Sequence, residues 1–593
     1  MNILVFLLIS LVVHSIPIPP SRRFLQFNYL IRWLPLRLVW GTVAWAVICL
    51  MMVATLPWAT LNLILSMGVL MVFTSGFRLG TIDDFRLSMR APFTAIGIVI
   101  IIVVPAFSGV VSWTSDVSNA QYFDAMITET DEPLFSNPIP DNMVRLVTQE
   151  YAVYTAYQHI SEFGSNAVVA AAHITTVNDT LVWICTIIST NVLAQNYVIG
   201  FVVIDANDPQ SVTPYSITNT TIPVGEGLFW DRNIQFGNYL TDMTSSYEYA
   251  YPTFDPSGGL VYVQTRTPIG FDFIERAIGP RVYAENGTVY EYASIEETPD
   301  WITQAYSEEW LEREISRWGG YRRGDGFDLF AGGFLWMVQP SNDRLEIHED
   351  TRYIINPDSG RVEAMITVNP VTNTRALAGV FRATQEGVIY HDMSSYDFIS
   401  GDAAIANVVA DIPAPAGGRV VGAMPLLYPV QINSTFVKWT WYAPIFWMDG
   451  SYDDDGYYHI SNMNLHALAM VDAGNADLFT WKALGGSLSG GDLVYAVRSD
   501  YIALFGGEIE QQAPETFNLT ATVDAKESYQ QNGETHIVLR TSNSTYRYIE
   551  GIPSWMNSTS WYTLLFDIGI GDSFTATIHE VDGVYRIVAI IKN

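Results

Sequence analysis

Cysteine and lysine are scarce in this chain of 593 residues, and each shortage narrows the class of protein. The two cysteines are Cys49, within a long apolar run, and Cys185, within a predicted strand much later in the chain, so we expect no disulfide between them. A long outer region without a disulfide framework is untypical of animal secreted proteins and fits an archaeal or bacterial cell surface. Only four lysines occur, so arginine supplies most of the positive charge.

Charged residues are almost absent from the first 113 positions, and their absence predicts a membrane bundle. Residues 38–77 contain no charged side chain over 40 residues, twice the roughly 20 needed to cross a bilayer once. Pro57 and Trp58 suit a tight hairpin in the middle of this stretch. The first apolar run lacks the basic start and the cleavage site of a secretory signal, so we expect it to be retained. The sequence therefore predicts about four spans, at residues 1–16, 38–56, 58–77 and 91–111.

Arginine placement predicts the orientation of this bundle. Seven arginines fall in the two loops that follow the first and the third span: Arg22, Arg23, Arg32, Arg37, Arg78, Arg86 and Arg90. The positive-inside rule places both loops in the cytoplasm and residues 114–593 outside the cell. Because His14 is the one ionisable residue inside the expected spans, we interpret the bundle as an anchor in membrane lipid rather than a conduction path.

The remaining 480 residues are strongly acidic. Seven arginines and two aspartates give the first 113 residues a balance of +5, so the rest carries −36 of a chain total of −31. Such a field repels nucleic acid, which excludes it as a partner and favours a protein partner or a homo-oligomer. Seven N-x-S/T sequons lie in this outer part and are candidate glycosylation sites: Asn178, Asn219, Asn286, Asn433, Asn518, Asn543 and Asn557.

The outer part is expected to be multidomain, α+β and strand-rich. Its predicted domains are an α+β module at 114–220, a central α+β domain at 221–411 with a helix at 299–318, a second α+β module at 419–511, and a small barrel at 512–593. The helix of the first module is expected at 141–163. Five alternating strands in the last domain resemble an OB fold, although the negative charge disfavours the nucleic-acid role usual for that fold.

The two α+β modules end on similar sequences. Val203-Ile-Asp-Ala206 and Val471-Asp-Ala473 each close a strand with an Asp-Ala pair followed by turn residues. Both modules resemble the helix-plus-antiparallel-sheet units of PepSY-type domains, which implies an internal duplication. Turn chemistry alone is the alternative explanation.

One dense polar segment, residues 343–352, supplies the candidate catalytic side chains. Glu346, His348 and Asp350 could serve acid–base catalysis, or they could form one solvated face of a strand together with Arg344. We expect the solvated strand face. The chain contains no P-loop, dinucleotide fingerprint, CxxC pair or G-x-S-x-G motif.

Asp453 and Asp455 are candidate metal ligands in an acidic turn that mimics the start of a calcium loop. The twelfth position of the pattern is Asn462 instead of a bidentate glutamate. We therefore expect weakly bound Ca²⁺ at most, and no other cofactor.

These observations favour a membrane-anchored cell-surface protein with a structural, binding or assembly role over an enzyme. Two alternatives stay open: a membrane-tethered hydrolase or transferase that uses residues 343–350, and an accessory subunit of a transport or secretion complex.

Overall fold

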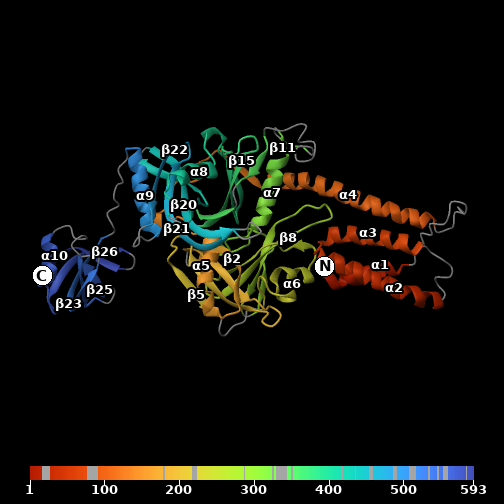
Figure 1. Ribbon diagram of the computed structural model, residues 1–593, viewed down its shortest axis with the longest axis horizontal. Helices are drawn as coiled ribbons and strands as arrows, with labels where there is room; N and C mark the ends of the chain where they lie inside the picture. The colour runs from red at the N-terminus through yellow and green to blue at the C-terminus, as the bar shows by residue number, and fades with distance from the viewer. Residues whose placement is uncertain are drawn as a thin grey trace. The chain divides into compact units, whose positions relative to one another are not determined.

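The computed structural model is shown in Figure 1. It describes residues 1–16, 27–75, 91–177, 180–216, 224–285, 287–323, 326–328, 343–348, 351–415, 418–433, 436–452, 458–484, 490–506, 516–531, 534–543, 546–551, 559–581 and 584–592. The chain divides into two compact units, Met1–Gly507 and Glu508–Asn593. Each unit is described by itself below.

Four helices open the first unit: α1 Ile3–Ser15, α2 Phe27–Ala46 with a π-helical end at Val47–Met51, α3 Leu56–Ser75 and α4 Ala91–Asp124. Among the described residues, three stretches are long and apolar enough to cross a membrane: Trp33–Met51, Leu56–Thr74 and Pro92–Asp124. Helix α1 is apolar but has only 13 residues. Helix α4 continues 13 residues past the expected end at 111, since neither glycine nor proline follows the apolar run to stop it.

Helices α3 and α4 meet through two glycines. A Cβ at Gly97 would lie 2.8 Å from the Gly68 carbonyl oxygen, and a Cβ at Gly68 would lie 2.5 Å from the Ile100 side chain. Small residues at such a crossing let two backbones approach closely, which is how packing holds helices together in lipid.

A buried polar cluster joins α1, α2 and α3. His14 Nδ1 lies 2.8 Å from the Ser10 carbonyl oxygen, which can only accept, so Nδ1 carries the proton. His14 Nε2 lies 3.0 Å from Ser66 Oγ, and Ser66 accepts from Trp40 Nε1 at 3.0 Å. The imidazole therefore joins three helices through polar contacts of the kind that hold helices together in lipid.

Arg37 was expected in a cytoplasmic loop, and that expectation is wrong. It lies in α2 with 1% of its surface exposed. Its Nη1 donates to the carbonyl oxygens of His14 (3.1 Å) and Ile16 (2.7 Å), which lack helical partners because α1 ends there. A helix terminus in an apolar bundle thus accounts for a buried arginine.

Backbone hydrogen bonds attach the bundle to the outer part of the first unit. Met243 N–H donates to the Met1 carbonyl at 2.9 Å, and Leu56 N–H donates to the Met243 carbonyl at 2.8 Å. Tyr239 hydroxyl donates to the Ala54 carbonyl at 2.9 Å. The chain start and the α2–α3 turn therefore lie at the same end of the bundle as the outer part (Figure 1).

The outer part contains four antiparallel meanders. The first is β2 Ala167–Val177, β3 Thr180–Ser189, β4 Val198–Asp205 and β5 Val212–Ser216. The second is β6 Ser245–Ser246 with β7 Ala250–Phe254, then β8 Leu260–Pro268, β9 Ile278–Ala284 and β10 Val289–Glu291. The third is β13 Leu345–Ile347 with β14 Arg352–Ile355, then β15 Val362–Pro370, β16 Gly379–Thr384 and β17 Gly387–Asp392. The fourth is β18 Arg419–Gly422 with β19 Leu426–Asn433, then β20 Phe436–Tyr452, β21 Tyr458–Asp472 and β22 Asn475–Ala483.

A helix precedes each meander: α5 Gln149–Gln158, α6 Ile234–Thr241, α7 Glu308–Tyr321 and α8 Gly401–Asp411. Helix α9, Gly490–Leu504, follows the fourth. Strand β1, Ile127–Thr130, pairs in parallel with β17, and β11 Arg322–Arg323 pairs with β12 Gly326–Phe327. Helices α5 and α7 share one core with the first and third meanders, which includes Trp183, Trp310, Trp318 and Phe381.

Two helices start later than the sequence predicts. The helix expected at 141–163 begins at Gln149, and Thr148 caps it by accepting from Tyr151 N–H. The helix expected at 299–318 begins at Glu308, and Ser307 caps it by accepting from Trp310 N–H at 3.1 Å. In both cases the helix begins after a Thr or Ser that caps it, and not at the proline or aspartate further upstream from which the start was predicted.

The first meander is tied to its helix by a small set of hydrogen bonds. Val147, which precedes the α5 cap, donates its N–H to the Ala206 carbonyl at 2.9 Å. Trp183 Nε1 donates back to the Val147 carbonyl at 2.9 Å. Asp205 Oδ1 accepts from the N–H of Asn207 at 2.8 Å and so closes the turn.

The fourth meander repeats each of these contacts. Ile399, which precedes the α8 cap, donates to the Ala473 carbonyl at 2.8 Å, and Trp441 Nε1 donates to the Ile399 carbonyl at 3.1 Å. Asp472 Oδ1 accepts from Gly474 N–H at 2.8 Å. Equivalent residues thus make equivalent bonds at both Asp-Ala turns, as an internal duplication requires.

Helix α4 packs its extension along α7. Trp318 Nε1 donates to Asp124 Oδ1 at 2.8 Å, and Arg317 Nε donates to Asp116 Oδ1 at 3.0 Å. The Phe123 ring meets the Trp310 ring edge-on at 5.7 Å. The apolar helix that enters the bundle is therefore continuous with the core of the outer part.

The second unit is a closed five-stranded barrel. Its strands are β23 Thr516–Gln531, β24 Glu534–Thr541, β25 Tyr548–Gly551, β26 Ser573–Val581 and β27 Val584–Lys592, with α10 Thr559–Asp567 between β25 and β26. The order around the barrel is β23-β24-β25-β27-β26, and β25 runs parallel to β27. The five strands predicted from alternation are confirmed.

The glycine crossing generates a prediction. Gly97→Ala should push α4 from α3, because the nearest obstacle is backbone, and should destabilise the protein by about 1–3 kcal/mol. Gly109→Ala on the same helix is the control, since a Cβ there meets nothing within 4 Å. Thermal melts in detergent should show a lower Tm for the first variant alone. Equal melts would mean that the crossing is looser than described.

Candidate functional site

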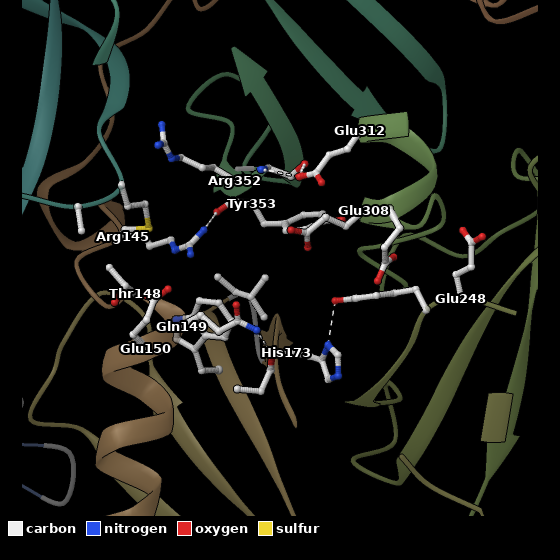
Figure 2. Close-up of a pocket in the computed structure, with 18 of the residues that line it drawn as sticks. Arg145, Thr148, Gln149, Glu150, His173, Glu248, Glu308, Glu312, Arg352 and Tyr353 are labelled. Atoms are coloured by element: carbon white, nitrogen blue, oxygen red, sulfur yellow. Dashed lines mark hydrogen bonds between the residues drawn. The ribbon is translucent and has the colours of Figure 1, made fainter. Parts of the chain in front are cut away.

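The first unit contains a partly open cavity of about 480 Å³ between its meanders (Figure 2). Residues at or beside the first strands of all four meanders line it: Ala172, His173 and Ile174 on β2, Tyr249 before β7, Thr351 to Tyr353 around β14, and Ala423 with Met424 before β19. The N-terminal turns of three helices contribute the other wall, through Thr148 to Glu150 on α5, Gln235 on α6, and Glu308, Glu309 and Glu312 on α7. All four meanders thus contribute to the cavity.

Carboxylates dominate this lining. Six glutamates face two guanidinium groups and one imidazole: Glu150, Glu226, Glu248, Glu308, Glu309 and Glu312 against Arg145, Arg352 and His173. An aqueous space with this lining carries negative charge and favours cations over anions.

Three of the glutamates are held by protein partners. Glu312 Oε1 accepts from Thr351 N–H at 3.0 Å and from its hydroxyl at 2.7 Å. Glu248 Oε2 pairs with Arg313 Nη1 at 3.0 Å. Glu226 pairs with His173, as described below. These contacts fix the positions of the three side chains.

Two further carboxylates face the cavity without partners. Within the described ranges, Glu150 and Glu308 have neither a hydrogen bond nor an ion pair. Burial, followed by the charges of Glu312 and Glu309, raises the pKa of Glu308 to about 7. A ligand cation would relieve this repulsion, because it would favour the ionised form of Glu308.

His173 lies between Glu226 and Tyr249. Its Nε2 is 2.6 Å from Glu226 Oε2, and its Nδ1 is 2.9 Å from the Tyr249 hydroxyl. Burial alone would lower the pKa of His173, but the neighbouring Glu226 carboxylate outweighs it and the pKa is raised. The pair therefore favours an imidazolium that neutralises one carboxylate of the lining.

Arg145 and Tyr353 complete the opposite side of the cavity (Figure 2). Arg145 Nη1 donates to the Tyr353 carbonyl at 3.0 Å. Burial, followed by the charge of Arg352, lowers the pKa of Arg145 to about 9, so the group stays cationic at neutral pH. The Tyr353 hydroxyl is buried and has no hydrogen-bond partner in the part of the chain that the structure describes. A buried hydroxyl left unpaired costs about 1–3 kcal/mol.

The residues singled out from the sequence lie elsewhere. Glu346 is in β13 opposite Asn369, half-buried, and His348 follows the strand with its Nε2 3.5 Å from Asp402 on α8. Neither lines the cavity. The expected continuous strand is broken, since β13 and β14 pair separately with β15. Asp350, Asp453 and Asp455 lie outside the described residues, and weak calcium binding stays a prediction.

Three of the candidate glycosylation sites are described. Asn518 is exposed on β23, Asn433 is exposed at the end of β19, and Asn543 is half-buried, with its Oδ1 accepting from Tyr546 N–H at 3.1 Å. Asn178, Asn219, Asn286 and Asn557 lie outside the described residues.

The residues that line the cavity could not be predicted as a site from the sequence, because no motif contains them. Glu308, Glu309 and Glu312 belong to the helix expected at 299–318 but to no motif, and His173 carried no signal within its apolar strand. One signal was present: Ser307 followed by two glutamates marks a helix start, and Glu308 and Glu312 share a face.

In the described ranges, no group of three or more His, Cys, Asp or Glu side chains is placed to hold a metal ion. The cavity glutamates come from several elements: Glu150 from α5, Glu308, Glu309 and Glu312 from α7, and Glu226 and Glu248 from the segments before α6 and β7.

Comparison with known proteins gives no family. No family model and no curated protein matches the chain. A solved structure of a GH43 β-1,3-galactosidase with galactodeoxynojirimycin is similar at 10% identity, with a TM-score of 0.16, over 70% of this chain and 92% of that one. Similarity at this level does not place the chain in that fold.

His348→Ala should be nearly neutral. The His348 side chain is 38% exposed and its partner Asp402 is 53% exposed, and exposed pairs contribute about 0–1 kcal/mol. A thermal melt should move little, and a broad hydrolase screen should give the same result for both proteins. An activity reduced about 10²-fold with an unchanged melt would instead make His348 catalytic.

Glu308 should make folding stability depend on pH. Its folded pKa of about 7 lies above the usual 4.5, so the folded state holds the proton more tightly. The stability that protonated Glu308 contributes to the folded state is fully present below about pH 4.5 and is lost as pH rises through about 7. The Tm should therefore fall between pH 5 and pH 8, and Glu308→Gln should reduce that fall. Part of the dependence should remain, because burial also raises the pKa of Glu314 to about 7. An unchanged slope in Glu308→Gln would contradict the assignment.

Proposed function

We propose that this protein is a membrane-anchored binding protein whose outer part holds a small amine-bearing cation in the glutamate-lined cavity. The cavity itself carries the proposal: about 480 Å³ of space and a lining with six glutamates. Glu150 and Glu308 form no hydrogen bond or ion pair within the described ranges, and the nearby positive charges of Arg145 and His173 offset only part of the repulsion that raises the pKa of Glu308. A polyamine, with several ammonium groups along a flexible chain, matches carboxylates spread over opposite walls.

The anchor has four spans in this proposal, with α1 the shortest, and residues 114–593 lie outside the cell. The attachment of the chain start and of the α2–α3 turn to the outer part supports an even number of crossings. Arg22, Arg23, Arg78, Arg86 and Arg90 then belong to the cytoplasmic side. Asn433 and Asn518, both exposed, would be accessible to glycosylation at a cell surface.

The barrel is proposed to be OB-like and to serve as a docking module for a protein partner. Support comes from its strand order, from the parallel β25–β27 pair and from the helix between β25 and β26. The acidic outer region makes a cationic protein surface the better partner than nucleic acid.

A hydrolase or transferase is the second candidate, and one observation favours it. A carboxyl with a pKa of about 7, as Glu308 has, is suited to general acid–base catalysis near neutral pH. The site would then be the cavity, and Glu346, His348 and Asp350 would have no part in it.

Spermidine binding tests the proposed function. Calorimetry on the full chain in detergent should show binding that strengthens from pH 6 to pH 8, since Glu308 ionises over that range. The double variant Glu308→Gln and Glu309→Gln should weaken spermidine binding at least tenfold, because it removes two negative charges that would face the ammonium groups. A tenfold loss corresponds to about 1.4 kcal/mol of binding free energy.

Glu386→Gln is the matched control for that measurement. Glu386 is a surface glutamate with a side chain 81% exposed, paired with Arg361, and it lies outside the cavity. Equal losses in the control and in the double variant would show non-specific attraction to the acidic surface. Absence of any spermidine binding at low salt would refute the polyamine assignment.

A further inference from the structure

We propose that the β8–β9 loop, residues 269–277, lies in the lipid interface of the membrane, with Phe271 as the inserted side chain. This inference is independent of the cavity. It rests on how the loop is attached to α3 and α4, on its depth along those helices, and on an exposed aromatic side chain at its tip.

The loop is clamped to the membrane helices. The Phe273 ring meets the Trp58 ring of α3 edge-on at 4.8 Å. Asn119 of α4 holds the loop backbone from the other side: its Nδ2 donates to the Phe273 carbonyl at 3.2 Å, and its Oδ1 accepts from Glu275 N–H at 2.8 Å. Asn119 is fully buried. The loop therefore cannot move away from the helices without breaking these contacts.

The contact with Trp58 sets the depth of the loop. Trp58 is the third residue of α3, at the start of the apolar stretch Leu56–Thr74. This end of α3 is the one that adjoins the outer part, because Leu56 N–H donates to the Met243 carbonyl. The Phe273 ring thus packs beside the outer end of a membrane-length helix, where the edge of the hydrocarbon layer is expected.

Phe271 is the side chain that this depth leaves uncovered. It is 67% exposed, on a short loop that also contains the Asp272–Arg276 ion pair. An exposed phenylalanine held at the edge of a bilayer is stabilised by interfacial lipid, where aromatic side chains concentrate. The charged pair beside it stays at the level of the headgroups.

The backbone of the loop supports a fixed position. Phe273 has φ of +59°, a conformation uncommon for a bulky residue. Such a conformation persists only where surrounding contacts over-determine it. The Trp58 ring and the two Asn119 hydrogen bonds supply those contacts.

Site-directed labelling tests the proposal, because Cys49 and Cys185 are both buried. Phe271→Cys is labelled with an environment-sensitive fluorophore in the full chain, reconstituted into phosphatidylcholine–phosphatidylglycerol bilayers. Tyr157→Cys is the control: it is 46% exposed on α5, away from the bundle (Figure 1). The labelled parent protein gives the background.

The expected result is blue-shifted emission at position 271 that brominated phospholipid quenches and aqueous iodide does not. Position 157 should be quenched by iodide alone. Water-like emission at 271, quenched by iodide and unaffected by brominated lipid, would overturn the proposal. Because Phe271 is largely exposed, its substitution should leave the fold intact, and an unchanged Tm of the labelled protein checks this.

Discussion

The burial of the α4 extension against α7 is the contact on which the first unit depends. Helix α4 leaves the bundle without a break, and Asp116 and Asp124 bind Arg317 and Trp318 of α7. Since α7 begins at the cavity, one helix pair fixes the glutamates of its first turn relative to the bundle. A network of ion pairs extends from this α4–α7 contact to the cavity. Glu275 accepts from both Arg313 and Arg317 of α7, and Arg313 also pairs with Glu248 in the cavity wall.

How much of this was visible in the sequence depends on the range of the interaction involved. Apolar runs and alternation are local, so the helices of the bundle, the β2–β4 and β20–β22 strands, and the five barrel strands were predictable. Helix starts at Gln149 and Glu308 required choosing among several local caps. The cavity required knowing that α5, α6 and α7 point their first turns at one place, which is a property of the folded chain alone.

The polar segment 343–350 was misleading because those of its charged residues that the structure describes are close in sequence but do not gather around a cavity in the fold. Polar density identified Glu346 and His348, but charge on a surface is inexpensive and says little about a site. The informative carboxylates are those held near one another in partial burial, such as Glu308, where desolvation shifts the proton equilibrium. Arg37 is the membrane counterpart: its sequence position indicated a loop, while the unpaired carbonyls at the end of α1 determined where it packs.

The repeated Asp-Ala turns have an evolutionary consequence. The first and fourth meanders keep the same backbone and tryptophan contacts, yet the equivalent helix caps differ in role: Thr148 borders the cavity and Ser400 does not. The backbone and tryptophan contacts that the two meanders share are therefore independent of the side chains that line the cavity. A lineage could exchange those side chains and acquire a new specificity while the scaffold, once duplicated, stayed unchanged.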